Sequence, residues 1–349
     1  MKKSFFILLL SSICTIAFGI EPNPRTLAEG MQPQVSMDTK GIVRIAFGQG
    51  SKIYCSTSID KGLTFSNPVF VAEVPKMHLG MTRGPQIASS VSYSVITAID
   101  VAGKIHSFKL DHSTKKWNKI DFVNDMSGSA PEGLMSIAAD NKDNFYAVWL
   151  DTRIMKKNNI FFSTLSGKGS NWTKNALTYK SPEGNVCECC KPSIAAKGSR
   201  VTIMFRNWIS GSRDLYVMKS SDSGKSFTQA QKLGIGTWKL KGCPMDGGSV
   251  SIDNSGAVHT AWKREGSVYY CKPGSREIEI GTGRGVSLTT MGNQPIVMFQ
   301  DKEGIKLISV NDKQILFSNK GESLKSIALP DNKILCVWEE ENKIRFKKI

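Results

Sequence analysis

Short apolar runs separated by polar turns repeat along the chain from residue 33 to its end. Seven stretches share one pattern, in which a short strand, a turn and a second strand follow one another, and the second strand usually ends in an aromatic residue. They begin at Pro33, Gly84, Gly133, Lys191, Gly248, Gly285 and Glu322. Runs of this length predict β-strands, and no helical period of 3.6 residues competes with them. The pattern therefore predicts an all-β fold.

The spacing of these stretches predicts how the strands are grouped. Two more short strands follow most stretches, as at residues 52–58 and 68–74. Four short antiparallel strands, repeated in this way, predict a β-propeller of four-stranded antiparallel blades. The last unit has three obvious strands, and we expect a segment near residues 22–32 to supply the fourth. Such closure would bring the two termini together and remove an exposed sheet edge.

Two hairpin turns carry the same phrase, S-x-D-x-G-x-[ST]-F. Its defining residues are Ser58, Asp60, Gly62 and Phe65 in the first copy, and Ser220, Asp222, Gly224 and Phe227 in the second. The Asp side chain accepts hydrogen bonds from turn amides, the Gly adopts a positive φ, and the aromatic ring enters the adjacent core. We expect both copies to be structural.

Residues 1–19 have the order of an export signal. Lys2 and Lys3 precede an apolar stretch at residues 5–10, and residues 17–19 form a small-x-small cleavage site. The apolar stretch is too short to span a bilayer, and no later segment reaches 18 apolar residues. We expect residues 20–349 to form a single domain in the periplasm or outside the cell.

The chain is basic, with 46 Lys and Arg residues against 30 Asp and Glu residues and a formal net charge of +16. The Lys residues are scattered, without a basic helix or an aromatic-interleaved RNA motif, so we expect no nucleic-acid partner. A basic surface is either simply solvated or attracts acidic glycans and anionic cell surfaces.

The hairpin phrase, the export signal and the four-strand units together resemble the sialidase-like (neuraminidase) superfamily, whose Asp-box or BNR repeats are similar to these two turns. The resemblance covers essentially the whole chain after the signal. It implies an Asp-box propeller, in which the Asp boxes lie away from the active site. Members of the superfamily usually have six blades, whereas seven stretches are present here, so we expect six or seven blades.

The residues with reactive or charged side chains fall mainly in connections that a propeller places on one face. These are the connections between second and third strands and those between blades. Their members are Arg83, Glu132, Asp151, Arg153, Arg206, Trp208, Arg213, Asp214, Asp246, Lys263, Arg264, Asp301 and Glu339. Convergent polar groups in a concavity are typical of ligand sites. We therefore expect a pocket at the axis with both signs of charge.

The resemblance also implies a chemistry for this pocket. Sialidases hold a substrate carboxylate with three arginines and use an aspartic acid as acid/base and a Tyr–Glu pair as nucleophile. The implied substrate-binding candidates are Arg83, Arg153 and Arg206, followed by Trp208, Arg213 and Arg264. The implied catalytic candidates are Asp151 or Asp246, with Glu132 or Glu183 as the partner carboxylate. Tyr269 and Tyr270 lie in one strand and are expected to pack there, so no nucleophile is assigned.

Four cysteines lie in two consecutive connections between blades, namely Cys187, Cys189, Cys190 and Cys243. In an exported protein they are expected to form two disulfides, and three pairings are open. A copper or zinc thiolate site and a redox pair at Cys189–Cys190 are the alternatives. The remaining cysteines of the mature chain, at positions 55, 271 and 336, lie within strands and are expected to be buried thiols.

These observations favour a glycoside hydrolase, or a close relative, that acts on acidic glycans or glycoproteins of the sialic-acid type and needs no cofactor. A non-catalytic propeller that binds a glycan or a protein across the same face is the first alternative. A propeller with a thiolate metal or redox site at the cysteines is the second. Fold alone does not decide among them.

Overall fold

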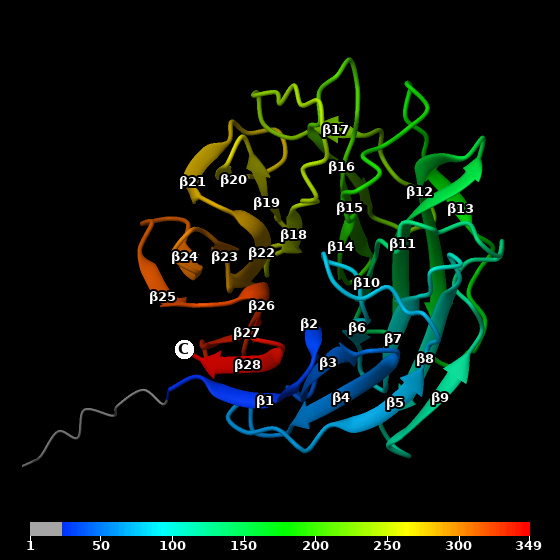
Figure 1. Ribbon diagram of the computed structural model, residues 1–349, viewed down its shortest axis with the longest axis vertical. Coiled ribbons are helices and arrows are strands. Elements are labelled where there is room, and N and C mark those ends of the chain that lie inside the picture. The colour runs from blue at the N-terminus through cyan, green and yellow to red at the C-terminus, as the bar shows by residue number, and fades with distance from the viewer. Residues whose placement is uncertain (1–22) are drawn as a thin grey trace, which may run out of the picture.

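A computed structural model describes residues 23–349, so the export signal expected at residues 1–19 lies outside the described part of the chain. In that part every regular element is a β-strand, and 28 strands form seven four-stranded antiparallel sheets arranged around one axis (Figure 1). The all-β propeller is confirmed, with seven blades. Within residues 23–349 no helix is long and apolar enough to cross a membrane.

Six blades are built from consecutive strands, each blade running from the axis outward. Blade 1 comprises β2 (Met31–Met37), β3 (Val43–Gln49), β4 (Lys52–Ser58) and β5 (Val69–Glu73). Blade 2 comprises β6 (Gln86–Ser89), β7 (Tyr93–Ile99), β8 (Ile105–Asp111) and β9 (Lys116–Ile120). Blade 3 comprises β10 (Met135–Ala139), β11 (Asn144–Ile154), β12 (Lys157–Ser166) and β13 (Ala176–Tyr179). Blade 4 comprises β14 (Ser193–Lys197), β15 (Arg200–Arg206), β16 (Leu215–Ser220) and β17 (Gln231–Lys232). Blade 5 comprises β18 (Ser249–Ile252), β19 (Val258–Arg264), β20 (Ser267–Cys271) and β21 (Ile278–Thr282). Blade 6 comprises β22 (Arg284–Met291), β23 (Gln294–Gln300), β24 (Ile305–Ser309) and β25 (Ile315–Asn319).

The seventh blade joins the two ends of the described chain. Its inner strands are β26 (Glu322–Ala328), β27 (Ile334–Glu340) and β28 (Lys343–Lys348), and its outer strand is β1 (Arg25–Glu29). In the antiparallel pairing of β1 with β28, Arg25 lies opposite Phe346 and Glu29 lies opposite Lys343. The expected closure of the ring by a segment near residues 22–32 is therefore confirmed, and β1 lies along β28 in Figure 1.

The core lies between neighbouring blades. In β27 every residue from Ile334 to Glu339 is buried, because both faces of the sheet are covered by other blades. Tyr146 and Phe162 of blade 3, for example, pack with Phe205 of blade 4. A strand covered on both faces needs a continuous apolar run, which is why the second strands of the blades do not alternate with polar residues.

Each Asp box fastens one blade to its neighbour. In the first, the Ser58 hydroxyl donates to Asp60 Oδ1 at 2.7 Å, the Gly62 amide donates to Ser58 Oγ at 2.8 Å, and Gly62 has a φ of 78°. Burial would raise the pKa of Asp60, but hydrogen bonds from Thr64 and its neighbours lower it to about 2. The Phe65 ring then meets Phe346 of blade 7 edge-on, with 4.9 Å between ring centroids.

The second Asp box repeats this arrangement between blades 3 and 4. Asp222 accepts hydrogen bonds from the Ser220 hydroxyl at 2.7 Å and from the Ser226 amide at 3.0 Å. The Phe227 ring packs edge-on against Phe162, with 5.2 Å between centroids. Both boxes connect a third strand to a fourth strand, which places them on the side of the ring opposite the connections between blades.

Candidate functional site

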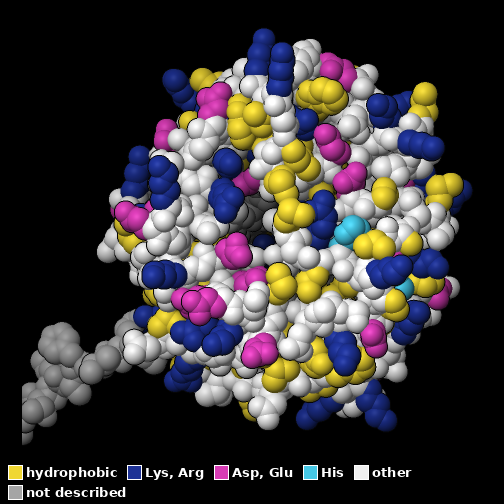
Figure 2. Space-filling view, viewed as in Figure 1, with side chains coloured by type: hydrophobic (Ala, Val, Ile, Leu, Met, Phe, Trp, Pro, Cys, Tyr) yellow, Lys and Arg dark blue, Asp and Glu magenta, His cyan; other side chains and the backbone are white. Residues whose placement is uncertain are grey.

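A pocket of about 690 Å³ opens at the centre of the ring. Figure 2 shows a hollow there, with acidic and basic side chains around it. Its wall includes residues 80–82 from the connection β5–β6, residues 243–248 from the connection β17–β18, and Glu339 from the end of β27. Connections between blades and the ends of second strands therefore meet at one mouth, as the loop sorting predicts.

Seven ionisable residues line this axial pocket. The basic ones are Lys191, Lys263, Arg284 and Lys325, and the acidic ones are Asp246, Glu322 and Glu339. Four of the seven lie at or next to the innermost strand of a blade, because those strands surround the axis and direct side chains into it. They are Lys191, two residues before β14, together with Arg284 in β22 and Glu322 and Lys325 in β26.

Lys191 and Lys325 are the most confined of the basic side chains. The Lys191 ammonium donates to Gln86 Oε1 of β6. Burial holds its pKa well below the usual value, and the charge of Lys325 adds to that effect. Burial also lowers the pKa of Lys325 to about 8, against the opposing influence of Asp246. Two ammonium groups that destabilise each other in one confined space favour an anion between them.

Backbone amides hold two of the acidic side chains, Asp246 and Glu339. Asp246 accepts hydrogen bonds from the Gly248 amide at 3.1 Å and from the Gly285 amide at 2.9 Å, so it ties blade 5 to blade 6. Glu339 Oε2 accepts the Gln32 amide at 3.0 Å. Burial raises the pKa of Glu339 even though the Gln32 amide favours its charged form. Carboxyl groups placed in this way accept hydrogen bonds from ligand hydroxyls.

Arg206 lies beneath the pocket wall and is 1% exposed. Its guanidinium donates to three backbone carbonyls: Nε to Asp246 at 2.8 Å, Nη1 to Arg213 at 2.6 Å and Nη2 to Lys263 at 2.9 Å. The carbonyls of Asp246 and Arg213 belong to two separate connections, and that of Lys263 belongs to the end of β19. The hydrogen bonds of Arg206 therefore hold these backbone segments of the pocket wall together.

Arg153 and Asp151 form a closed ion pair. Arg153 Nε and Nη2 each lie 2.9 Å from an oxygen of Asp151, and Nη1 lies 2.6 Å from Asp125. Asp151 also accepts the Trp149 indole N–H at 2.8 Å and has no exposed surface. Neither Arg153 nor Asp151 lines the axial pocket.

The other sequence candidates are also engaged in contacts within the protein. Arg83 Nε donates to the backbone carbonyl of Glu132 at 2.6 Å. Arg264 pairs with Glu277 at 2.6 Å and lies over the Tyr269 ring at 4.1 Å. Arg213 forms an ion pair with Glu188 and lies over the ring of the half-exposed Trp208. Glu183 accepts a hydrogen bond from the Ser210 amide, and the Tyr270 hydroxyl is hydrogen-bonded to His259.

The structure thus brings Asp246 into the axial pocket and leaves the three arginines Arg83, Arg153 and Arg206 outside it. Sequence reasoning missed Lys191, Arg284 and Lys325. The signal was present for Lys325, a long charged side chain in the middle of the inner strand ESLKSIA. A long charged side chain on the axial strand of a propeller points into the pocket.

The loop cysteines lie beside this wall. A disulfide joins Cys189 to Cys243 with 6.2 Å between their Cα atoms, and so links the connection β13–β14 to the connection β17–β18. Cys187 and Cys190 are buried free thiols. Of the two expected disulfides, the structure contains this one, and the cysteines at 55, 271 and 336 are buried. A disulfide is compatible with an exported protein.

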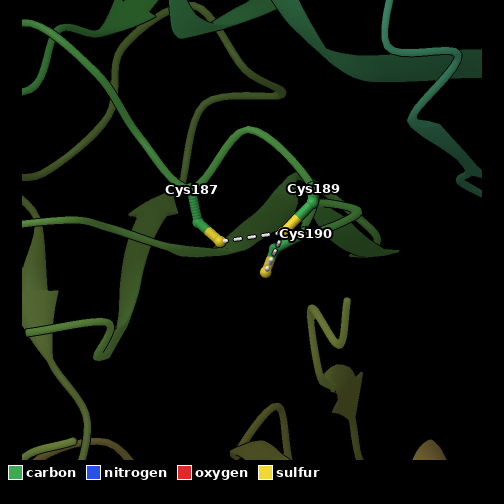
Figure 3. Close-up of side chains that lie close together, drawn as sticks. All are labelled: Cys187, Cys189 and Cys190. Atoms are coloured by element: carbon green, nitrogen blue, oxygen red, sulfur yellow. Dashed lines mark hydrogen bonds between the residues drawn. The ribbon is translucent and has the colours of Figure 1, made fainter. Parts of the chain in front are cut away.

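The sulfurs of Cys187, Cys189 and Cys190 converge (Figure 3). Cys187 Sγ lies 3.8 Å from Cys189 Sγ, which lies 4.0 Å from Cys190 Sγ. Arg213 Nη1 donates to Cys187 Sγ at 3.2 Å. Burial would raise the pKa of Cys187, but a hydrogen bond with Cys190 and the charges of Arg206 and Arg213 lower it. Burial and the neighbouring Cys187 raise the pKa of Cys190.

The chain matches no known family profile and no curated protein. Several solved structures have a similar fold. The lectin BP39L from Burkholderia pseudomallei has a TM-score of 0.59 at 10% identity, over 92% of this chain and 98% of the lectin. A polysaccharide lyase, an ulvan lyase bound to -[GlcA(1-4)Rha3S]-, has a TM-score of 0.56 at 10% identity, over 92% and 94% of the two chains. Trypanosoma rangeli sialidase has a TM-score of 0.51 at 11% identity, over 93% of this chain and 55% of that one.

At these identities the similarity concerns the fold. The chain is a seven-bladed β-propeller, and its fold is similar to that of this sialidase as well as to those of the lectin and the lyase.

Proposed function

We propose that this protein is an exported propeller that binds an acidic saccharide in its axial pocket. The observation that carries the proposal is the set of four basic side chains in the pocket wall, Lys191, Lys263, Arg284 and Lys325. The ion pairs formed within residues 23–349 include none of the four. Cations that repel each other in a confined space are unfavourable, and the carboxylate of a ligand between them supplies an ion-pair partner.

The rest of the wall fits the hydroxyls of a sugar. Asp246, Glu322 and Glu339 provide acceptors, and Gln32 and Gln300 provide amide groups. A volume of about 690 Å³ is within the range of about 300–1,000 Å³ that is usual for ligand sites. A uronic or sialic acid, with one carboxylate and several hydroxyls, matches this mixture. A lectin and an ulvan lyase share the fold, in agreement with saccharide binding.

Substitution of the confined lysines tests the proposal. Lys325→Met and Lys191→Met each remove one charge-assisted hydrogen bond, a contribution of about 1.5–3 kcal/mol, so affinity for an acidic oligosaccharide falls about 10–100-fold. The matched control is Lys168→Met, since Lys168 is exposed in the turn after β12 on the opposite side of the ring. Calorimetric titration of the mature protein with sialyl and uronate oligosaccharides measures the effect. Equal affinity in all three variants would contradict the proposal.

Hydrolysis of the bound saccharide is the second candidate, favoured by the raised pKa of the buried Glu339 beside a pocket that also contains Asp246. A carboxyl group whose pKa is raised by burial is better suited to general acid catalysis than an ordinary carboxyl group. Release of the fluorophore from a fluorogenic sialoside tests it. If the Glu339→Gln variant loses this release but still binds the saccharide, the hydrolase is supported. No release above blank by the wild-type protein, with binding intact, leaves saccharide recognition as the function.

A further inference from the structure

We infer that Cys187, Cys189 and Cys190 form a thiolate site for Cu(I), which the Cys189–Cys243 disulfide blocks until it is reduced. The inference is independent of saccharide binding. The cluster lies in the connection β13–β14, behind the pocket wall, and two of its three sulfurs are almost inaccessible to solvent: Cys187 is 0% exposed and Cys190 is 1% exposed.

The spacing of the sulfurs fits a single metal ion. All three lie within 4.8 Å of one another, with separations of 3.8 Å from Cys187 to Cys189 and 4.0 Å from Cys189 to Cys190. With metal–sulfur bonds of about 2.3 Å, three ligands in a plane around the ion lie about 4.0 Å apart. The backbone of this one short segment therefore already places the ligands near their bound positions.

The number of ligands favours Cu(I) over Zn(II). Structural zinc sites take four ligands, whereas in the described part of the chain the mutually close group comprises three sulfurs. Thiolate sulfur is a soft ligand that suits both Cu(I) and Zn(II), but three thiolates satisfy the coordination of Cu(I). Cys243 is exposed at the pocket mouth, which suits it to be the removable partner of Cys189.

The surroundings compensate the charge of such a complex. Three thiolates and one Cu(I) carry a net charge of −2. Arg213 donates to Cys187 Sγ at 3.2 Å, and Arg206 accepts the Cys187 amide on its backbone carbonyl at 3.0 Å. The Arg213 guanidinium, which also pairs with Glu188 at 3.3 Å, lies next to the sulfurs, and the positive charges of Arg206 and Arg213 both act on Cys187. Partners of this kind orient the ligands and strengthen the site.

Loading requires a balanced redox step before metal binding. A dithiol reductant transfers two electrons and two protons to the Cys189–Cys243 bond, which gives two thiols and an oxidised dithiol. Cys187, Cys189 and Cys190 then release three protons as Cu(I) binds, and Cys243 remains a free thiol. Under oxidising conditions Cys189 is withheld and two thiols remain.

The Cys243→Ser variant provides the decisive test, since it frees Cys189 without any reductant. Mature wild-type protein and the variant are titrated with Cu(I) under anaerobic conditions, in competition with a chromogenic Cu(I) chelator. We expect one Cu(I) per chain in the variant without reductant and in the wild type only after reduction. In the Cys243→Ser background, Cys187→Ser or Cys190→Ser weakens binding by more than the roughly 10–100-fold loss that follows removal of an outer partner.

The control in the same background is Cys336→Ala, because Cys336 is a fully buried thiol in β27, within the core of blade 7. Reduced wild-type protein provides a second measurement if Cys243→Ser does not fold, as judged by circular dichroism. The inference is overturned if folded protein with Cys189 free does not compete with the chelator, or if Cys187→Ser and Cys336→Ala bind alike. Equally tight binding of Zn(II) in a parallel titration would overturn the assignment to Cu(I).

Discussion

Replacement of Arg206 by Met distinguishes an arginine that organises the pocket wall from one that contacts the ligand. The guanidinium of Arg206 is 1% exposed and donates to the carbonyls of Asp246, Arg213 and Lys263. Arg206→Met leaves three buried carbonyls without these donors. Each buried carbonyl left without its donor costs about 1–3 kcal/mol. We therefore expect unfolding free energy to fall by about 4 kcal/mol, a large part of the about 5–15 kcal/mol typical of a domain.

Urea-induced unfolding, followed by tryptophan fluorescence, measures this loss. The matched control is Arg200→Met at the other end of β15, where Arg200 is exposed and forms one long contact of 3.4 Å with the Ser255 carbonyl. We expect a change within about 0.5 kcal/mol for the control. If Arg206→Met loses less than about 1 kcal/mol of stability but no longer binds acidic saccharide, Arg206 acts on the ligand and the reasoning is refuted.

Three further predictions concern charge, close packing and closure of the ring. Because the pKa of Lys325 is lowered to about 8, its ammonium group loses its proton as pH rises through that value. We therefore expect the saccharide affinity measured by titration to be steady from pH 6 to 7.5 and to weaken by up to about tenfold per pH unit above pH 8. Unchanged affinity at pH 9.5 would contradict this. A Cβ added to Gly247 would overlap the Lys191 backbone carbonyl, so Gly247→Ala lowers the melting temperature and weakens saccharide binding together. The control Gly169→Ala, whose added Cβ would meet the Ser166 carbonyl oxygen at 3.4 Å, leaves saccharide binding unchanged. Deletion of residues 23–30 removes β1 and exposes the edge of β28; we expect accelerated unfolding and concentration-dependent association in light scattering, and a monomeric, equally stable variant would argue against closure by β1.

The architecture was predictable because its signals are local. The Asp-box phrase at Ser58 and Ser220 specifies side-chain-to-amide bonds within one turn, and the continuous apolar runs of the second strands reflect coverage by neighbouring blades. The closing strand was predictable because a blade with three strands leaves an open edge. Because each unit repeats the same grouping of strands, the repeat predicts the propeller as a whole.

The pocket residues were less predictable because a sequence shows which loop carries a side chain but does not show which groups become its hydrogen-bond or ion-pair partners. Arg206 stands in a loop-adjacent position typical of a ligand contact, but backbone carbonyls from distant segments take its donors. Arg153 likewise pairs with Asp151, two residues earlier. Lys325 lies within a strand, whereas the expected site residues were those in the connections between strands.

A titration with two matched saccharides tests the central claim most directly. A uronate oligosaccharide and its carboxyl-reduced counterpart, which differ in the carboxylate alone, are titrated into the wild-type protein at pH 6.5. Because the ammonium groups of the pocket form no direct ion pair among the residues that the structure describes, we expect the acidic form to bind at least about tenfold more tightly, equivalent to about 1.4 kcal/mol. Equal affinity for the two forms, or preference for the neutral one, would contradict an axial pocket built to hold an anion.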